Sequence, residues 1–387
     1  MLTTLLKPNF FNTFFIKPSD ELVKLTLLGL LFYSGIYYGG LYQKPESFFI
    51  GYLLFFATLF YVSYCIFANK KLSLRIILTA YLLIALWTIF NSPHPIVDTM
   101  PAFTEGPLKF LSGINPYAST YTRTYPNIEP NYYNHFPLSF IYPLPFVLIF
   151  HDPRFSLIFA NFISAFIIYK LFNKKNRNMT IFFIAILFFL PRSFYMLEHM
   201  YLDQIVFAFY MIFIYFYSKQ KKILYLFFLS LSCLIKQHLL LILPIFFSVK
   251  VNLLLLKKWR NSFFFLIPFL IPLYFILINP NAFLTNTLFG LTSSKITSPI
   301  NISLTLPTFL KNIYSIPFNL VISSLCVFFL FFYFLTLKSR LSFTFKVGII
   351  LFSFNFFFHH AFFNSYYLVI QFFLLEIAFE YFEKVLS

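Results

Sequence analysis

Long apolar runs divided by short clusters of Lys and Arg constrain this chain more than any other feature of its sequence. A helix needs roughly 20 mostly apolar residues to cross the hydrocarbon of a bilayer, and fewer where neighbouring helices or local thinning help. The twelve runs nearest that length cover residues 22–40, 47–68, 74–91, 155–172, 180–191, 204–218, 223–235, 239–256, 263–278, 317–337, 347–358 and 363–379. The pattern predicts an all-α, polytopic transmembrane helical bundle.

Composition excludes the main alternatives to a membrane protein. Of the 387 residues, 60% are hydrophobic and only 11% are charged, whereas a soluble domain has about a quarter of its residues charged. The high apolar content also excludes a disordered chain. The three cysteines, Cys65, Cys233 and Cys326, lie far apart inside apolar runs. We expect them to pack as small hydrophobic side chains, with no metal site and no redox pair.

The net charge of +17 does not indicate a nucleic-acid partner, because the positive residues stand between the apolar runs. Their placement follows the positive-inside pattern of cytoplasmic loops, which makes membrane lipids the expected surroundings of the chain. The clusters include Lys70 and Lys71, Lys174 and Lys175, and Lys257 and Lys258.

One apolar run leaves the number of spans open. The run 138–150, LSFIYPLPFVLIF, is short and contains Pro143 and Pro145, so it suits a re-entrant or interfacial segment better than a full span. We therefore expect twelve spans with both termini cytoplasmic, and thirteen if this run crosses the bilayer. The expected single domain consists of N-terminal spans 1–91, an outer loop 92–154 with interfacial helices, central spans 155–278, a second outer loop 279–316 and C-terminal spans 317–387.

Ionisable residues gather on the outer side of this topology. All seven histidines and seven of the twelve acidic residues fall there. Several stand at the ends of short spans, namely Glu198, His199, Asp203, Lys236, His238, His359 and His360. Ionisable groups so close to hydrocarbon are costly, which makes them candidates for a functional site. The alternative is that these side chains only reach toward the lipid headgroups.

Several stretches follow the order of motifs in a known enzyme family. The first outer loop reads HPIVDTMPAFTEGPLKFLSGINPYAST and then NYYNHFPLSFIYPLPFVLIF; EHMYLDQIVFAFYMIFIYFY, LSLSCLIKQHLLLILPIFF and FFFHHAFFNSYYLVIQFF follow. Over 93–373 the chain resembles the integral-membrane GT-C glycosyltransferases, closest to the mannosyltransferases that use polyprenyl-phosphate mannose. It departs from them in two places: their Tyr-Pro-Pro is broken here by Leu144, and their Gly-Gln is Asp203-Gln204.

The resemblance implies an enzyme that moves a mannose-like hexose from a polyprenyl-phosphate donor to the hydroxyl of a lipid-linked or glycan acceptor. It implies inversion at the anomeric carbon, no cofactor, and an active site on the periplasmic side of a cell inner membrane. An alcohol attacks poorly until a base takes its proton, and a carboxylate within hydrogen-bond reach suffices. Asp98 occupies the family's catalytic position, and its alternative role is the N-cap of the following helix. Glu105 is the reserve base or a hydroxyl-binding partner.

The same resemblance assigns residues that bind the donor phosphate and the substrates. They are Lys236, Gln237, His359, His360, Glu198, Asp203, Gln204 and Tyr117. The departing polyprenyl phosphate needs a cation in a low-dielectric site, where electrostatic stabilisation is usually the largest catalytic contribution. Lys236 is the expected phosphate ligand, with snorkelling as its alternative. Tyr117, in the turn that begins at Asn115, is expected to stack on sugar.

No metal site is expected, because Glu198-His199 lacks the second histidine of a zinc motif. Two other functions stay open. An O-antigen polymerase or ligase also has many spans and large outer loops, but it relies on outer-loop Arg and His, whereas Arg123 and Arg154 are isolated here. A lipid or sugar transporter places ionisable groups near the bilayer midplane and often has two similar halves. This chain shows no similarity between its halves.

Overall fold

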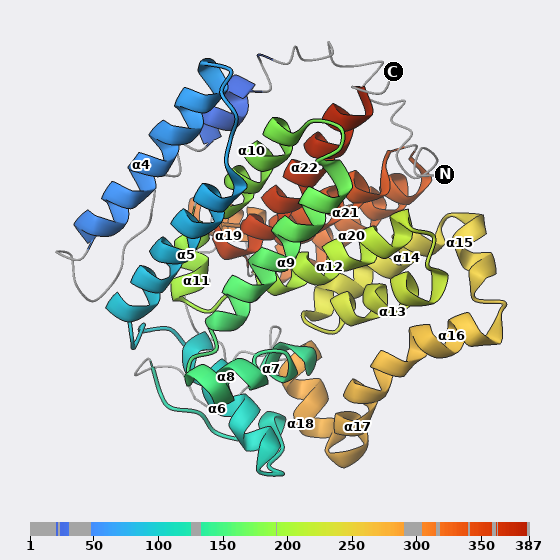
Figure 1. The fold of residues 1–387 in the computed structure, drawn as a ribbon. Coiled ribbons are helices and arrows are strands. Elements are labelled where there is room, and N and C mark those ends of the chain that lie inside the picture. The colour runs from blue at the N-terminus through green and yellow to red at the C-terminus, as the bar shows by residue number, and fades with distance from the viewer. Residues whose placement is uncertain are drawn as a thin grey trace.

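The computed structural model of the protein describes residues 21, 24–30, 48–124, 133–190, 192–289, 304–314, 318–339, 341–357, 361 and 363–384. All regular secondary structure in these residues is helical, which confirms the predicted all-α class. Figure 1 shows long helices packed side by side, with shorter helices gathered across the lower end of the molecule.

The helices follow the apolar runs of the sequence. The first half of the chain contains α4 (Phe48–Phe67), α5 (Leu74–Asn91), α6 (Thr99–Leu111), η2 (Pro116–Ala118), α7 (Leu138–Ile141), α8 (Leu144–Phe150), α9 (Phe155–Phe172), α10 (Arg177–Phe188), α11 (Ser193–Glu198) and α12 (Asp203–Ser218). The middle contains α13 (Lys222–Cys233), η3 (Gln237–Leu241), α14 (Ile242–Phe247), α15 (Lys250–Leu255), α16 (Trp259–Leu266), η4 (Ile267–Phe269), α17 (Leu270–Ile278), α18 (Pro280–Leu284) and η5 (Thr285–Phe289). The last part contains α19 (Leu306–Tyr314), α20 (Phe318–Lys338), α21 (Phe343–Phe357) and α22 (Phe363–Lys384).

Five stretches of the described chain are long and apolar enough to cross a membrane. They are Ile50–Phe67, Leu74–Asn91, Phe155–Phe172, Trp259–Ile278 and Ser365–Glu383. Seven further apolar helical stretches have 10–17 residues each, so the membrane character of the chain is confirmed while the count of twelve spans stays a prediction.

One expected span is not a continuous helix. The run 239–256 was predicted as a single helix, but the structure divides it into η3, α14 and α15. The chain breaks after Phe247, where the side-chain amide of Asn252 donates to the carbonyl of Phe246 at 2.9 Å and satisfies a group that the broken helix leaves open. The run 138–150 is likewise two short helices, as its prolines favour.

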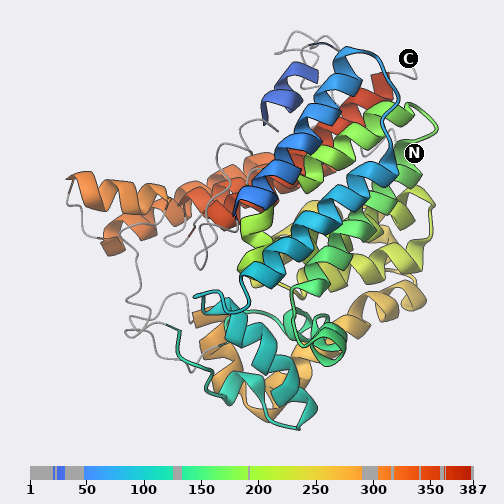
Figure 2. The same ribbon diagram turned by 60° about the vertical axis from the view of Figure 1, so that its left-hand side comes forward.

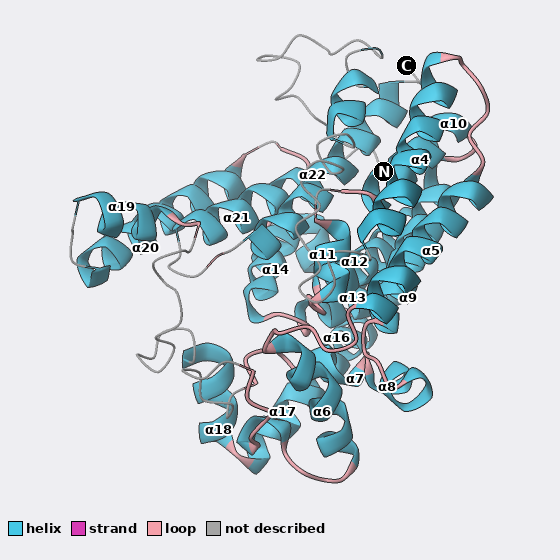
Figure 3. Ribbon diagram, turned by 90° about the vertical axis from the view of Figure 1, so that its left-hand side faces the viewer, coloured by secondary structure: helices cyan, strands magenta, loops and turns pink. Residues whose placement is uncertain are grey.

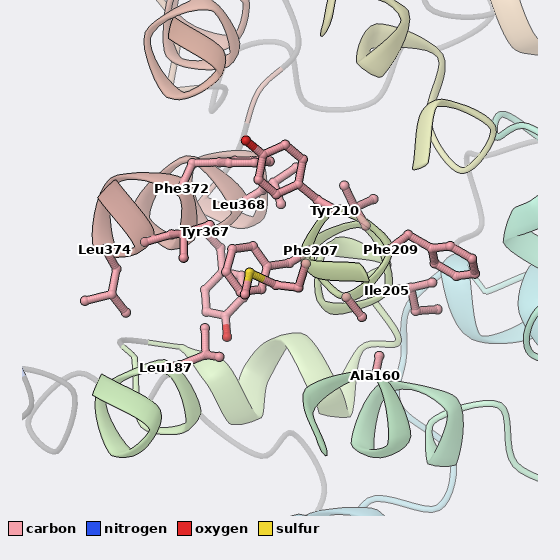
Figure 4. Packing of buried hydrophobic residues seen from close by; sticks show 14 of the residues in the cluster. Ala160, Leu187, Ile205, Phe207, Phe209, Tyr210, Tyr367, Leu368, Phe372 and Leu374 are labelled. Carbon is pink, nitrogen blue, oxygen red and sulfur yellow. The ribbon is translucent and has the colours of Figure 1, made fainter. Parts of the chain in front are cut away.

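The core of the bundle centres on α12, which packs against α9, α13 and α22. Figure 4 shows Phe207 and Tyr210 of α12 beside Phe372 of α22, with Ala160 of α9 on another side of the helix. The Tyr210 and Phe372 rings lie 4.6 Å apart in an edge arrangement. Helices in a membrane associate through such close packing, because lipid tails are as apolar as the side chains themselves.

The two ends of the bundle differ in character. At one end, which we term the basic end, the loop 69–73 meets the first turn of α10 and the loop 173–176 meets the C-terminal part of α22. The backbone N–H of Leu72 donates to Asn178 Oδ1 at 3.2 Å, and Lys175 Nζ donates to the carbonyl of Phe382 at 3.3 Å. Two lysine clusters therefore share one end, as the charge pattern predicts.

The opposite end, which we term the loop end, consists of α6, α7, α8, α17 and α18. Figure 3 shows these helices together below the bundle, and Figure 2 shows α19 and α20 leaving the bundle sideways. α6 packs against α7, α8 and η2, and α18 packs against η2. The segment from α6 to α8 and the segment from α17 to α18 thus form one layer across the ends of the long helices.

Candidate functional site

The loop end joins the bundle through backbone hydrogen bonds between two distant segments. The N–H groups of Phe136 and Leu138 donate to the carbonyls of Ile235 and Leu234, both at 3.2 Å. The side chain of Gln237 then donates to the carbonyl of Asn134 at 3.0 Å. Gln237 therefore positions the loop 133–138 against the C-terminal end of α13.

A buried ion pair lies at this junction. Lys236 Nζ is 2.8 Å from Asp203 Oδ1, and the two side chains are only 11% and 1% exposed. Asp203 stands in the first turn of α12, where the helix dipole favours a negative charge. Its second carboxylate oxygen, Oδ2, is buried and has no hydrogen-bond partner within the described residues. Two of the predicted substrate-binding residues are thus in direct contact.

His135 lies close to Lys236, on the loop that pairs with its segment, and sequence reasoning did not place it in the site. Its ring stacks on Phe103 of α6 with centroids 5.5 Å apart. Burial, together with the nearby charge of Lys236, holds the pKa of His135 well below its ordinary value, so the ring is neutral at pH 7. The sequence signal was the aromatic, proline-rich stretch NYYNHFPLSF around it. His238 lies close by and stacks on Phe354 of α21 at 5.4 Å.

Asp98 stands at the start of α6, half-buried, in the layer that the loop end forms. Asp98 occupies the N-cap position of α6, as its alternative role predicts, but its backbone is already helical and its side chain makes no capping hydrogen bond to the helix. The neighbouring Thr99 hydroxyl donates to the carbonyl of His199. This contact brings the first turn of α6 against the segment between α11 and α12.

Glu198 and His199 are both buried at the end of α11. Glu198 Oε2 lies 4.0 Å from His199 Nδ1, with side chains 1% and 2% exposed. Burial lowers the pKa of His199 to about 4, so the pair has no ionic attraction at pH 7. The predicted site residues Glu198 and Asp203 consequently lie on one connected segment next to the start of α6.

Glu105 is engaged in a contact of its own, on α6. One carboxylate oxygen is 2.8 Å from Lys109 Nζ, and the other accepts the N–H of Thr122 at 3.0 Å. Lys109 also donates to the carbonyl of Thr120 and lies 4.2 Å above the ring of Tyr121. This set of contacts, the Glu105 clamp, ties the loop after η2 to α6.

Tyr117 does not present a sugar-stacking face, and that prediction is corrected. The residue is 1% exposed, and its ring is enclosed by Phe283, Phe275 and Tyr133 at centroid distances of 4.8, 5.2 and 5.7 Å. Its hydroxyl donates to the carbonyl of His135 at 2.9 Å. Tyr117 therefore supports the loop that holds His135, and the predicted turn at Asn115 is confirmed, with its side chain accepting the N–H of Tyr117.

The remaining predicted residues extend the site toward α22. Gln204 is completely buried beside Asp203 and lies near the hydroxyl of Tyr367, which donates to Ser193 Oγ at 3.2 Å. Tyr367 was not predicted from the sequence. His359 and His360 lie outside the described residues.

The chain matches no protein-family model and no curated protein. No cluster of three or more His, Cys, Asp or Glu side chains suited to a metal ion occurs in the part of the chain that the structure describes. The chemistry at hand is therefore that of a buried ammonium group, its carboxylate partner and neutral imidazoles, with a half-buried carboxylate at the start of α6.

Proposed function

We propose that this membrane protein is a glycosyltransferase of the GT-C type that transfers a hexose from a polyprenyl-phosphate donor to an acceptor hydroxyl. The observation that supports the proposal is the buried pair of Lys236 and Asp203. The pair lies where the segment from Glu198 to Asp203 meets the loop that holds His135. The first turn of α6 contacts the same segment. Residues far apart in the sequence thus surround one buried cation.

In the proposed reaction, Lys236 stabilises the phosphate of the donor and the charge that develops as it leaves. Asp203 is the counterion of Lys236 while the site is empty, which keeps an ammonium group from being buried alone. Asp98 takes the proton of the acceptor hydroxyl, and the acceptor oxygen attacks the anomeric carbon directly. Direct displacement inverts that carbon. The aromatic layer of the loop end keeps water from the reacting groups.

The placement of the ionisable groups favours transfer over transport. Glu198 ends α11, Asp203 begins α12 and Lys236 follows α13. A transporter is expected to hold such groups near the middle of its spans. Arg154, one of the two outer-loop arginines that a polymerase or ligase would use, is committed to backbone carbonyls of α5 and to Asp152.

The decisive assay measures transfer of radiolabelled sugar from a panel of polyprenyl-phosphate sugars in proteoliposomes. Asp98→Asn removes the base and leaves the shape of the side chain, so we expect transfer to fall by about 10²- to 10⁴-fold. Glu383→Gln, at the basic end, is the matched control and should leave the rate unchanged. Equal transfer by native protein and Asp98→Asn would contradict the role of Asp98.

A second prediction separates structure from chemistry at Lys236. Lys236→Met leaves the Asp203 carboxylate buried without its partner, which should cost about 3–5 kcal/mol of stability. The double variant Lys236→Met, Asp203→Asn removes both charges, so its unfolding midpoint in detergent should recover while sugar transfer stays lost. Transfer at the native rate by the double variant would show that Lys236 does not hold the donor phosphate.

A further inference from the structure

In the proposed reaction the phosphate group gains a negative charge, whereas the Lys236–Asp203 pair beside it has no net charge. A polyprenyl-phosphate sugar is a phosphodiester with one negative charge. The polyprenyl phosphate that leaves is a monoester, whose second ionisation has a pKa of about 6, so it has nearly two negative charges at neutral pH. Lys236 and Asp203 together are neutral. The second charge therefore lacks a compensating group in this pair.

His135 is placed to supply that compensation. The hydrogen bonds of Phe136 to Ile235 and of Gln237 to Asn134 fix its loop directly against the Lys236 segment. Stacking on Phe103 fixes the plane of the ring. Its Nδ1 is buried and has no hydrogen-bond partner in the described part of the chain. A buried ring nitrogen without a partner costs free energy unless a ligand or a proton engages it.

The charged and titratable groups that face His135 come from one neighbouring segment. They are Lys236 and His238, and Asp203 is already paired with Lys236. Burial and the positive charge of Lys236 keep His135 neutral. An anion bound beside Lys236 reverses this balance, because a nearby opposite charge favours the protonated ring.

We propose that His135 takes up a proton when a phosphate ester occupies the site and passes it from Nδ1 to the departing phosphate. The inference rests on the proposed function. The bond between the anomeric carbon and the phosphate oxygen breaks, and its electron pair stays on that oxygen. The acceptor oxygen bonds to the anomeric carbon while its proton goes to Asp98. The proton of His135, taken from water, moves to the phosphate oxygen, so the product leaves as the hydrogen phosphate monoester.

Calorimetric titration of the full-length protein with a short-chain polyprenyl phosphate tests this directly. Runs at pH 7.5 in buffers of different ionisation enthalpy report how many protons accompany binding. We expect uptake of about one proton by the native protein. We expect none by His135→Asn, together with binding weaker by about tenfold because the charged hydrogen bond is lost. His151→Asn is the matched control, since His151 is exposed in the left-handed turn after α8, and it should keep the native uptake.

The outcomes distinguish this inference from the function on which it rests. Native binding without proton uptake, or full uptake by His135→Asn, overturns the role of His135. If sugar transfer persists in that case, the glycosyltransferase proposal stands. Absence of both polyprenyl-phosphate binding and sugar transfer overturns the two together. If His135→Asn does not fold, absence of proton uptake in the native titration still overturns the role of His135.

Discussion

Glu105 holds the loop after η2 through its charge, which makes this loop sensitive to acid. Burial raises the pKa of Glu105, but hydrogen bonds from Lys109 and Thr122 outweigh that effect and lower it below the ordinary value. A carboxyl group whose pKa is lower in the folded protein stabilises it above the pKa of the unfolded chain. That stabilisation disappears as the pH falls through the folded pKa.

We therefore predict that acid opens the Glu105 clamp before the bundle unfolds. Hydrogen exchange at the Thr122 amide, corrected for its intrinsic rate, should accelerate about five- to tenfold once the pH has fallen from 7 through the lowered pKa of Glu105. Glu105→Gln should produce the same acceleration at pH 7. The Ile114 amide, which donates to the carbonyl of Lys109 at the end of α6, serves as the control. Acid-insensitive exchange at Thr122 would contradict the clamp.

Among the helices, α5 depends on a residue that lies outside it. Arg154 is fully buried, and its guanidinium donates to the carbonyls of Ser92 at 2.6 Å and Ile89 at 3.4 Å. These are groups that the C-terminus of a helix leaves without internal partners. Asp152 neutralises the guanidinium at 2.5 Å. One arginine thus links the end of α5 to the start of α9.

Replacing this arginine should destabilise the bundle strongly. Arg154→Met leaves two buried carbonyls and Asp152 without their partner, so we expect a loss of about 3–5 kcal/mol in unfolding free energy. Arg75→Met, at the exposed N-terminal turn of α5, is the matched control and should change stability by less than about 0.5 kcal/mol. Unfolding in detergent measures both, and similar midpoints for the two variants would refute the capping role.

The sequence predicts uninterrupted helices well and broken ones poorly. α5 and α9 coincide with the expected runs 74–91 and 155–172, since polar residues flank both runs. The break between α14 and α15 was missed because Asn252 satisfies a carbonyl from within an apolar run. Hydropathy registers the apolar neighbours of such a residue and not its hydrogen bond.

Some residues of the candidate site could be predicted from the sequence, but their contacts could not. Lys236 and Asp203 stood out because charge at the end of an apolar run is costly. Their pairing joins residues 33 positions apart, which no local pattern reports. Arg154 looks isolated in the sequence, although it is the largest fully buried side chain in the described part of the chain. Burial of a polar residue depends on the packed fold and cannot be read from its neighbours in sequence.

For the molecule as a whole, the contrast between its two ends predicts which loops share a side of the membrane. In a background without native cysteines, Ile114→Cys at the loop end and Lys174→Cys at the basic end are both exposed positions. A maleimide that cannot cross the bilayer should label each from one side only, and from opposite sides, in right-side-out and inverted vesicles. Labelling of both from the same side would contradict the arrangement of the bundle.

The hydrogen bond between Gln237 and the loop 133–138 has a consequence for how the protein is made. Its two residues are separated by 103 positions, and a ribosome adding about 5–20 residues per second needs roughly 5–20 s to synthesise that interval. Until the segment after α13 is synthesised, the loop lacks the carbonyls of Leu234 and Ile235 that accept its backbone hydrogen bonds. The loop and the Lys236 segment therefore come together only when the later half of the polypeptide has been inserted.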